Sequence, residues 1–301
     1  MDFDWDDLRV FLAVARGESL SQAGRLLKMD PATVGRRISR LEHRLGAALF
    51  ARSVQGYVLN NEGERLLVHA MRAESAMSQA GEELQGVAGQ LSGTVRIGAP
   101  DGSANYLLPQ VCAEICDQNP GLEVQIVAQP RVFNLSKREA DMAVTLSPPT
   151  AGRLMAQRIG DYKLHLAATE AYLNSHPPIR HPQDLKGHRI IGYIPDMIFD
   201  KEVDYLGQIG VEHVTLGSNS VAVQANWVRH GAGLAIVHDF CMPTLPGIRR
   251  VLADQISLTR TFYLVRHLDD QRVDRLNRFA DSLVQGMRDE ITRLENQARA
   301  L

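Results

Sequence analysis

Two short helices joined by a tight turn, predicted between residues 19 and 46, constrain the fold of this chain more than any other feature. Ser19 or Ser21 can accept hydrogen bonds from the free N–H groups that open the first helix. Asp30 suits the N-cap of the second helix, where Pro31 loses no hydrogen bond, and Gly46 suits its end. Each helix has one apolar face, formed by Ala23, Leu26 and Leu27 in the first and by Val34, Ile38, Leu41 and Leu45 in the second. This order of parts predicts a helix-turn-helix whose second helix can enter a DNA major groove.

Positive charge is concentrated in the same segment. From Arg25 to Arg52 there are seven lysines and arginines against two acids, a net charge of +5, whereas the whole chain carries −2. Such a patch contacts phosphates and gives salt-dependent affinity for nucleic acid. The alternative is the solvated face of an ordinary helix, but arginines on the open side of a two-helix turn favour DNA binding.

Residues 5–64 resemble the winged helix-turn-helix of LysR-type transcriptional regulators. The resemblance is carried by four stretches, residues 8–15, 19–23, 34–42 and 45–52. Chain length and the later segments fit the same family, so the resemblance covers essentially all 301 residues. We expect DNA contacts from Ser21, Gln22, Pro31, Ala32, Thr33, Arg36, Arg37, Arg40 and Arg52.

Several positions depart from the family pattern. Pro31 and Gly35 replace a base-reading glutamine and a phosphate-binding serine, while Gln55 and Leu59-Asn60 replace a wing arginine and a Leu-Thr pair. The arginines that serve general DNA binding remain, so the departures concern which bases are read. They also motivate the main alternative, a small-molecule sensor with a degenerate DNA-binding domain.

Composition places the chain among ordinary globular proteins of two or three domains. It is 45% hydrophobic and 23% charged, and no stretch approaches the roughly 18 consecutive apolar residues of a membrane span. The acidic start of the chain, residues 1–7, is unlike a secretory signal. Three cysteines without a CxxC spacing disfavour a disulfide framework. We therefore expect a cytoplasmic location and no membrane partner.

A long helix is predicted from about residue 62 to residue 91, after a short β wing at residues 54–60. Its apolar residues alternate at spacings of four and three: Leu66, Ala70, Ala73, Met77, Ala80, Leu84, Val87 and Leu91. That repeat is typical of a coiled-coil seam, and the alternative is a helix lying on its own domain. By the resemblance, this helix dimerises the protein, so we expect a homodimer or homotetramer that presents two recognition helices to an inverted repeat.

The remainder alternates strands with helices, which predicts parallel sheets with right-handed crossovers. Expected strands lie at residues 94–98, 122–128, 140–145, 165–168, 189–193, 214–216, 234–237 and 261–266, and expected helices at 105–119, 132–138, 220–229 and 272–294. The pattern resembles the two-lobed periplasmic-binding-protein fold of the family.

We thus predict an α+β multidomain chain with three parts. Residues 1–61 form the winged helix-turn-helix, 62–92 the coiled-coil linker helix and 93–301 an α/β effector-binding domain. Lobe one of that domain takes about 93–161 and 269–301, and lobe two about 162–268.

The resemblance implies a small-molecule effector between the lobes. Ligands of open α/β sheets sit at the carboxyl ends of strands, near helix N-termini. The polar residues predicted there are Asp101, Gly102, Ser103, Gln129, Thr145, Ser218, Asn219, Ser220 and His238. Each serine or asparagine is alternatively a simple helix cap, and His238 a loop residue. Because Gly102 and His238 replace residues usual in the family, and Asp101 is acidic, a simple carboxylate effector is disfavoured.

No motif indicates an enzyme. The chain lacks HExxH, P-loop and GxSxG sequences, its ten histidines are scattered, and Gly231-Ala232-Gly233 lacks the third glycine of a nucleotide loop. We expect no catalytic residue, metal or cofactor. The predicted function is a regulator of the LysR type that binds double-stranded DNA, responds to an effector and acts indirectly on RNA polymerase.

Overall fold

The computed structural model describes residues 3–53, 56–84, 90–128, 140–211 and 213–300. They form two compact units, Met1–Gly89 and Gln90–Leu301. Each unit has its own hydrophobic core.

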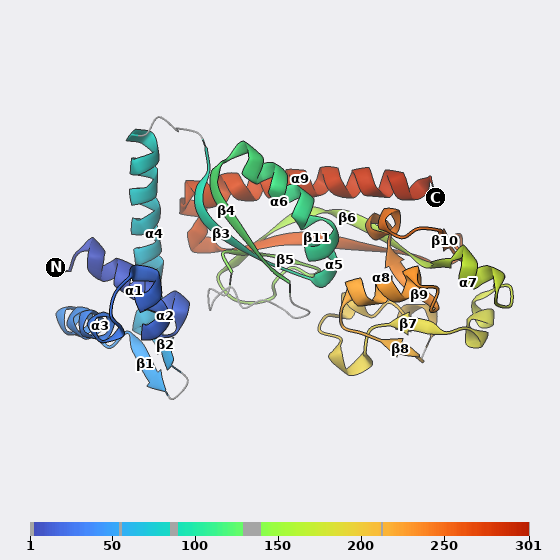
Figure 1. Ribbon diagram of the computed structural model, residues 1–301, viewed down its shortest axis with the longest axis horizontal. Helices are drawn as coiled ribbons and strands as arrows, with labels where there is room; N and C mark the ends of the chain where they lie inside the picture. The colour runs from blue at the N-terminus through green and yellow to red at the C-terminus, as the bar shows by residue number, and fades with distance from the viewer. Residues whose placement is uncertain (1–2, 54–55, 85–89, 129–139, 212, 301) are drawn as a thin grey trace. The chain divides into compact units, whose positions relative to one another are not determined.

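The first unit is a winged helix-turn-helix followed by a long helix (Figure 1). Its elements are α1 (Trp5–Gly17), α2 (Leu20–Leu27), α3 (Pro31–Leu45), β1 (Phe50–Ser53), β2 (Gly56–Leu59) and α4 (Asn61–Leu84). Strands β1 and β2 pair antiparallel and form the wing; β2 lies within the predicted range 54–60, whereas β1 precedes it and was not predicted. Val54 and Gln55, between them, lie outside the described residues.

The predicted helix ends are confirmed by their hydrogen bonds. Ser19, not Ser21, caps α2, because its Oγ accepts from Ser21 N at 3.2 Å. Asp30 Oδ1 accepts from Ala32 N at 2.8 Å and caps α3. Gly46 ends α3 in the left-handed region, at φ +67°, where an L side chain is strained. The three caps fix where α2 and α3 begin and where α3 ends.

Helix α1 supplies the centre of the first core, with Phe11 and Val14 fully buried against Val34 and Ile38 of α3. One predicted core position is wrong: Leu26 of α2 is 67% exposed. The side of α2 that packs on the core is formed by Ala23, Gly24 and Leu27, so Leu26 faces outward.

Helix α4 follows the predicted repeat only in part. Ala70 is fully buried in the core of the first unit, whereas Met77 is 51% exposed. The prediction that Leu91 lies on the same seam is wrong, because Leu91 directly precedes strand β3 (Ser92–Ala99) and is buried in the core of the second unit. The side chains of Ala80 and Leu84, and all of Val87, lie outside the described residues. Dimerisation through α4 remains a prediction.

The second unit contains one mixed sheet with helices against it. Its larger elements are β3 (Ser92–Ala99), α5 (Asp101–Tyr106), α6 (Leu108–Gln118), β4 (Gly121–Ala128), β5 (Met142–Thr145), β6 (Leu154–Thr169), α7 (Glu170–Asn174), β7 (Ile190–Gly192), β8 (Leu216–Gly217), α8 (Val221–Arg229), β9 (Leu234–His238), β10 (Ile248–Arg250), β11 (Ser257–His267) and α9 (Asp274–Arg299). Short 3₁₀ helices include η2 (Pro182–Gly187), η3 (Pro195–Met197), η4 (Lys201–Val203), η5 (Gly207–Ile209), η6 (Asp239–Thr244) and η7 (Leu268–Arg272). The predicted helix at 132–138 lies outside the described residues.

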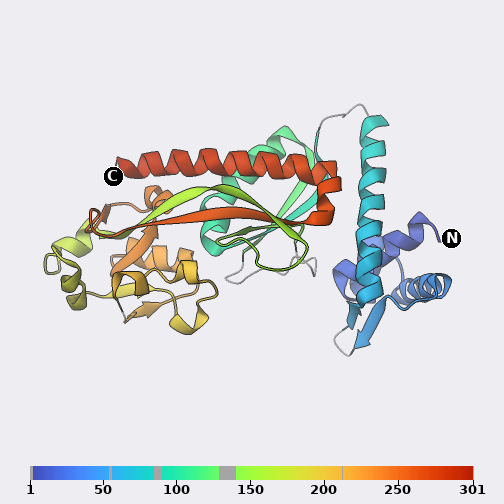
Figure 2. The ribbon, with the colours of Figure 1, turned by 180° about the vertical axis from the view of Figure 1, so that it is seen from behind.

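Parallel pairing is confirmed near both ends of the sheet, where β3 pairs with β4 and β5, and β7 pairs with β8 and β9. The described strands follow the order β4-β3-β5-β11-β6-β9-β7-β8, with β10 beside β6. In the middle the parallel prediction is wrong, because β6 and β11 are antiparallel partners from Leu154↔His267 to His165↔Ser257. Figures 1 and 2 show these two long strands side by side, joining the two parallel regions.

Helix α9 packs against α6 at one end of this unit and against η6 at the other. It buries a stripe that includes Phe279, Leu283 and Met287. One continuous core therefore runs through the unit. In the described part of the chain, no helix combines the length and apolar character needed to cross a membrane.

Candidate functional site

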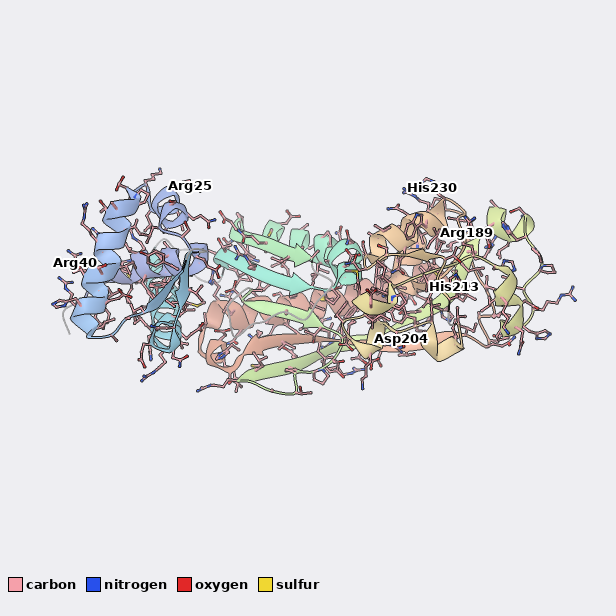
Figure 3. All side chains as sticks on the ribbon, turned by 90° about the horizontal axis from the view of Figure 1, so that it is seen from below. Arg25, Arg40, Arg189, Asp204, His213 and His230 are labelled. Atoms are coloured by element: carbon pink, nitrogen blue, oxygen red, sulfur yellow. The ribbon has the colours of Figure 1, made fainter. Side chains whose placement is uncertain are left out.

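The exposed face of α3 and the start of α2 carry the residues predicted to contact DNA. Ser21 and Gln22 are exposed at the first turn of α2, and Pro31, Ala32 and Arg36 are exposed on α3. Figure 3 shows Arg25 and Arg40 on the outside of this unit. The helix-turn-helix thus leaves polar and cationic groups accessible on one side of the recognition helix, α3.

Four of the predicted residues surround one hollow on α3: Thr33, Arg36, Arg37 and Arg40. Arg36 donates from Nη2 to Thr33 Oγ1 at 2.8 Å. Arg37 has Nη1 3.9 Å from Asp6 Oδ2, a pairing too exposed to hold it firmly. These guanidinium groups present N–H donors in a geometry that suits phosphate.

Asp7 of α1 organises the rest of the cationic surface. Its carboxylate is fully buried and accepts from Arg40 Nη2 at 3.1 Å and from Arg44 Nη1 at 2.8 Å. Arg40 keeps 51% of its side chain exposed while bound to Asp7. Sequence reasoning missed Asp7, since its partners are 33 and 37 residues away.

The wing is held close to the turn before α2. Tyr57 N donates to Glu18 O at 2.9 Å. Gly56, at φ +132°, lies so close that a Cβ there would be 2.3 Å from Glu18 O. Only glycine satisfies both constraints. Arg52 of β1 pairs through its backbone with Tyr57, but its side chain is outside the described ones.

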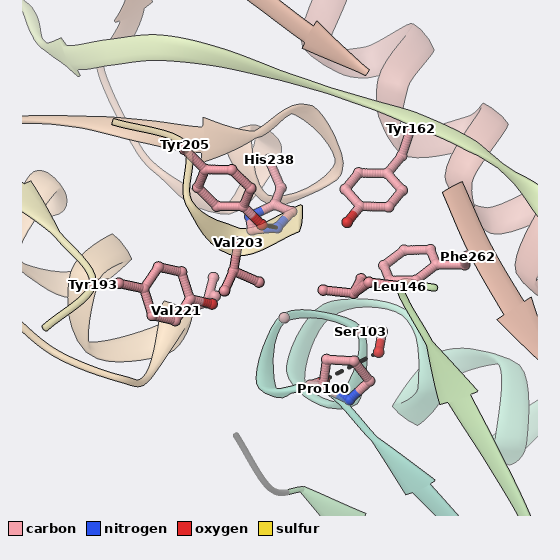
Figure 4. Close-up of a pocket in the computed structure, with 11 residues that line it drawn as sticks. Pro100, Ser103, Leu146, Tyr162, Tyr193, Val203, Tyr205, Val221, His238 and Phe262 are labelled. Carbon is pink, nitrogen blue, oxygen red and sulfur yellow. Dashed lines mark hydrogen bonds between the residues drawn. The ribbon is translucent and has the colours of Figure 1, made fainter. Parts of the chain in front are cut away.

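A second candidate site lies among α5, α8 and the central strands of the second unit. We call it the aromatic cavity (Figure 4). It is lined by Pro100, Gly102, Ser103, Leu146, Tyr162, Tyr193, Val203, Tyr205, Val221, His238 and Phe262. Its free volume is about 10 Å³, close to the minimum for one water molecule. The site is therefore a narrow, largely apolar cavity in this conformation.

The ionisable groups of the aromatic cavity are uncharged near neutral pH. Burial lowers the pKa of His238 to about 3, so its imidazole is neutral. Burial also raises the pKa of Tyr193, Tyr205 and Tyr162 well above the ordinary value. Tyr205 Oη lies 3.3 Å from His238 Nε2, a hydrogen bond that a neutral imidazole can accept. Arg260, whose guanidinium carbon lies 5.6 Å from the centroid of the Tyr205 ring, is paired with Glu202 at 2.9 Å.

Three predicted effector residues line the aromatic cavity: Gly102, Ser103 and His238. Two others join opposite walls, because Asp101 Oδ2 accepts from Ser220 Oγ and from Ala222 N, both at 3.0 Å. Ser220 also caps α8 by accepting from Val223 N. Asp101 and Ser220 thus hold the start of α5 against the start of α8.

The remaining predicted residues do not line the cavity. Ser218 Oγ accepts from Ser220 N at 3.1 Å and shapes the turn before α8. Thr145 Oγ1 donates to Ser147 O at 2.8 Å after β5. Asn219 is half-buried in the same turn as Ser218, and Gln129 lies outside the described residues.

Sequence reasoning missed the aromatic lining, Tyr162, Tyr193, Tyr205 and Phe262. Tyr162 and Phe262 face each other across the β6–β11 pair, with ring centroids 4.1 Å apart. Neither sits at the carboxyl end of a parallel strand, where the sequence predicts the ligand-binding residues. Among the described residues, no group of three His, Cys, Asp or Glu side chains is arranged to hold a metal ion.

Comparisons with known proteins match both units. Residues 5–64 match the model of the bacterial regulatory helix-turn-helix protein, lysR family, and residues 88–288 match the LysR substrate binding domain. The chain is 27% identical to the HTH-type transcriptional regulator PtxR of Pseudomonas aeruginosa, over 77% of this chain and 76% of that protein. It is 26% identical to the Mau operon transcriptional activator of Paracoccus denitrificans, over 90% and 93% of the two chains.

Solved structures show the same fold. CrgA of Neisseria meningitidis, a LysR-type transcriptional regulator, aligns with a TM-score of 0.59 at 23% identity, over 95% of this chain and 99% of that one. LysG of Corynebacterium glutamicum, solved full-length with the effector Arg bound, aligns with a TM-score of 0.63 at 19% identity, over 95% and 98% of the two chains.

Proposed function

The chain belongs to the LysR family of transcriptional regulators, and from this premise we propose which surfaces read DNA and effector. Proteins of this family combine a DNA-binding helix-turn-helix with an effector-binding domain, and this chain contains both parts. Their role is regulatory and not enzymatic. A protein that acts on the chromosome must reach it, so we place this one in the cytoplasm.

The DNA interface is the exposed face of α3 with the start of α2. The observation that carries this assignment is the cluster of Arg36, Arg37 and Arg40 around one hollow. Arg36 contacts phosphate, and Arg40 does so while anchored to Asp7. Pro31, Ala32 and Thr33, at the first turn of α3, face the base edges, and Arg52 of the wing reaches the neighbouring backbone.

The regulator acts as a homodimer or homotetramer on an inverted-repeat operator. Two copies joined through α4 set the spacing of two recognition helices. The effector occupies the aromatic cavity and binds one arrangement of its walls more tightly than another, and this differential affinity alone shifts the population. The shift changes the DNA bend and so the access of RNA polymerase.

Binding to the intergenic DNA upstream of its own gene tests the DNA assignment. The full-length protein is titrated at 50 and 200 mM salt, with random DNA as competitor. We expect selective binding that weakens steeply with salt, since each neutralised phosphate releases counterions. If the protein shows no preference over random DNA for this or any fragment of a genomic library, the alternative of a sensor with a degenerate DNA-binding domain is favoured.

A further inference from the structure

We propose that the aromatic cavity selects an uncharged small molecule that has a hydrocarbon ring and one hydrogen-bonding group, and that it rejects carboxylates. This inference rests on the assignment of the cavity as the effector site. Three features carry it: an uncharged lining, an anion position already filled by the chain itself, and one buried hydroxyl that lacks a partner.

The lining offers a flat apolar surface and no charge. Tyr162 and Phe262 stack with an interplanar angle of 19°, and Tyr162 also lies against His238 and Phe240. Such a surface suits a planar hydrocarbon ring. An ionised ligand would lose its hydration here without finding a counter-charge among the lining residues, which is costly.

The natural anion position beside the cavity is occupied by Asp101. The free N–H groups at the start of α8 favour a negative group, as at any helix N-terminus. Here Asp101 Oδ2 accepts from Ala222 N and Ser220 Oγ, and its Oδ1 accepts from Asn105 Nδ2 at 3.1 Å. A ligand carboxylate would find these donors taken and would be repelled by Asp101.

The polar contact left for a ligand is the hydroxyl of Tyr162. Tyr162 is 1% exposed, and its Oη makes no hydrogen bond of normal length to a described group, while the Tyr205 hydroxyl lies close enough to act on its pKa. Figure 4 shows this hydroxyl directed into the cavity. Buried polar groups nearly always have a hydrogen-bond partner, and its absence is unfavourable. A hydroxyl or carbonyl group of a ligand would supply that partner for the Tyr162 hydroxyl. Ser103 Oγ, which donates to Pro100 O at 3.0 Å, retains only acceptor capacity.

The small free volume couples ligand entry to movement. A ring cannot enter about 10 Å³ unless the walls separate. The Asp101–Ser220 contact joins those walls, so binding of a neutral ligand works against it and changes the position of α5 relative to α8.

Three ring compounds of similar size test the ligand class: benzyl alcohol, toluene and benzoate. Affinities are measured by ligand-observed NMR titration of the full-length protein at pH 7.5 without DNA. We expect benzyl alcohol to bind most tightly, toluene about fivefold more weakly, and benzoate at least tenfold more weakly than benzyl alcohol.

Two variants test the Tyr162 hydroxyl and the Asp101 carboxylate separately. Tyr162→Phe removes a hydroxyl that makes no hydrogen bond of normal length to a described group and keeps the ring, so we expect benzyl alcohol to lose about fivefold in affinity and toluene to be unaffected. Asp101→Ala frees the N–H groups at the start of α8, so we expect the affinity for benzoate to rise about tenfold relative to the affinity for benzyl alcohol. Asp117→Ala removes an exposed carboxylate of α6 and serves as the matched control, with no change for any probe.

The ligand class is overturned if benzoate binds the unaltered protein as tightly as benzyl alcohol, if neither neutral probe binds at 10 mM, or if Tyr162→Phe leaves all three affinities unchanged. None of these results bears on DNA binding, because no DNA is present. Conversely, loss of operator selectivity with the expected probe order retained would remove the regulator assignment and leave the ligand class standing.

Discussion

Arg44 of α3 and Asp7 of α1 meet at 2.8 Å, with the carboxylate of Asp7 fully buried. The same carboxylate binds Arg40, so one acid of the first helix fixes two cations of the recognition helix. A surface that attracts DNA must carry many like charges, and a buried carboxylate at its edge both offsets their repulsion and sets their positions.

Asp7→Ala should lower the free energy of unfolding of the first unit by about 2 kcal/mol. The variant leaves Arg40 and Arg44 without their shared partner, although both are partly exposed, which limits the loss. Urea denaturation followed by circular dichroism measures it. Asp6→Ala, which removes a carboxylate that is 53% exposed, should cost less than about 0.5 kcal/mol. Equal losses in the two variants would refute a special role for Asp7.

Arg36→Ala should weaken operator binding and reduce the salt slope of the binding constant by about one for each copy of the chain on DNA. Its guanidinium bonds to Thr33 and pairs with no acid in the described part of the chain, so it is available to phosphate. Arg158→Ala, on β6 of the second unit and 56% exposed, is the control and should leave the slope unchanged. An unaltered slope in Arg36→Ala would exclude Arg36 from the interface.

Gly56→Ala should destabilise the wing by more than about 2 kcal/mol and reduce DNA affinity. Its φ of +132° is strained for alanine, and the added Cβ would lie 2.3 Å from Glu18 O. Gly46→Ala makes a useful comparison, because it has positive φ and no atom within 4 Å of the added Cβ. It should cost only about 1 kcal/mol. Thermal unfolding of both variants checks the difference, and a milder effect in Gly56→Ala would contradict it.

The second unit should lose stability as the pH falls below about 6.5, the ordinary pKa of histidine. Burial lowers the pKa of His238 to about 3, so between these values the unfolded chain binds a proton that the folded chain does not. From pH 7.5 to pH 5 the loss should amount to about 2 kcal/mol.

His238→Gln removes this titration and keeps a hydrogen-bonding group for Tyr205, so its stability should fall less over the same pH range. Denaturation midpoints at the two pH values measure the difference. The exposed His213 gives the control, His213→Gln, which should follow the unaltered protein. If His238→Gln loses as much stability between the two pH values as the unaltered protein, His238 does not contribute to the acid sensitivity.

The sequence by itself determined the local features of this protein. Ser19, Asp30 and Gly46 mark helix ends through hydrogen bonds and backbone angles that involve only neighbouring residues, and they were predicted correctly. The apolar stripe of α3 was predicted from the helical spacing of its apolar residues alone, and Val34, Ile38 and Leu41 are buried as expected. The matched family models confirm the assignment that these local patterns suggested.

Only the tertiary structure decided the features that depend on distant residues. Leu26 was predicted on one apolar face with Ala23 and Leu27 but is 67% exposed, because the packing of α2 on the core turns Ala23 and Leu27 inward and Leu26 outward. The antiparallel β6–β11 pair brings Tyr162 against Phe262 across 100 positions of sequence, which no periodicity encodes. Asp101, predicted as a ligand residue, accepts a hydrogen bond from Ser220, 119 positions away, and this partner could not be predicted from the sequence. Side-chain partners of this kind are set by topology, since strand order and register bring them together. Periodicity in a sequence indicates which residues share a face of a helix or strand, but not which distant residues come into contact.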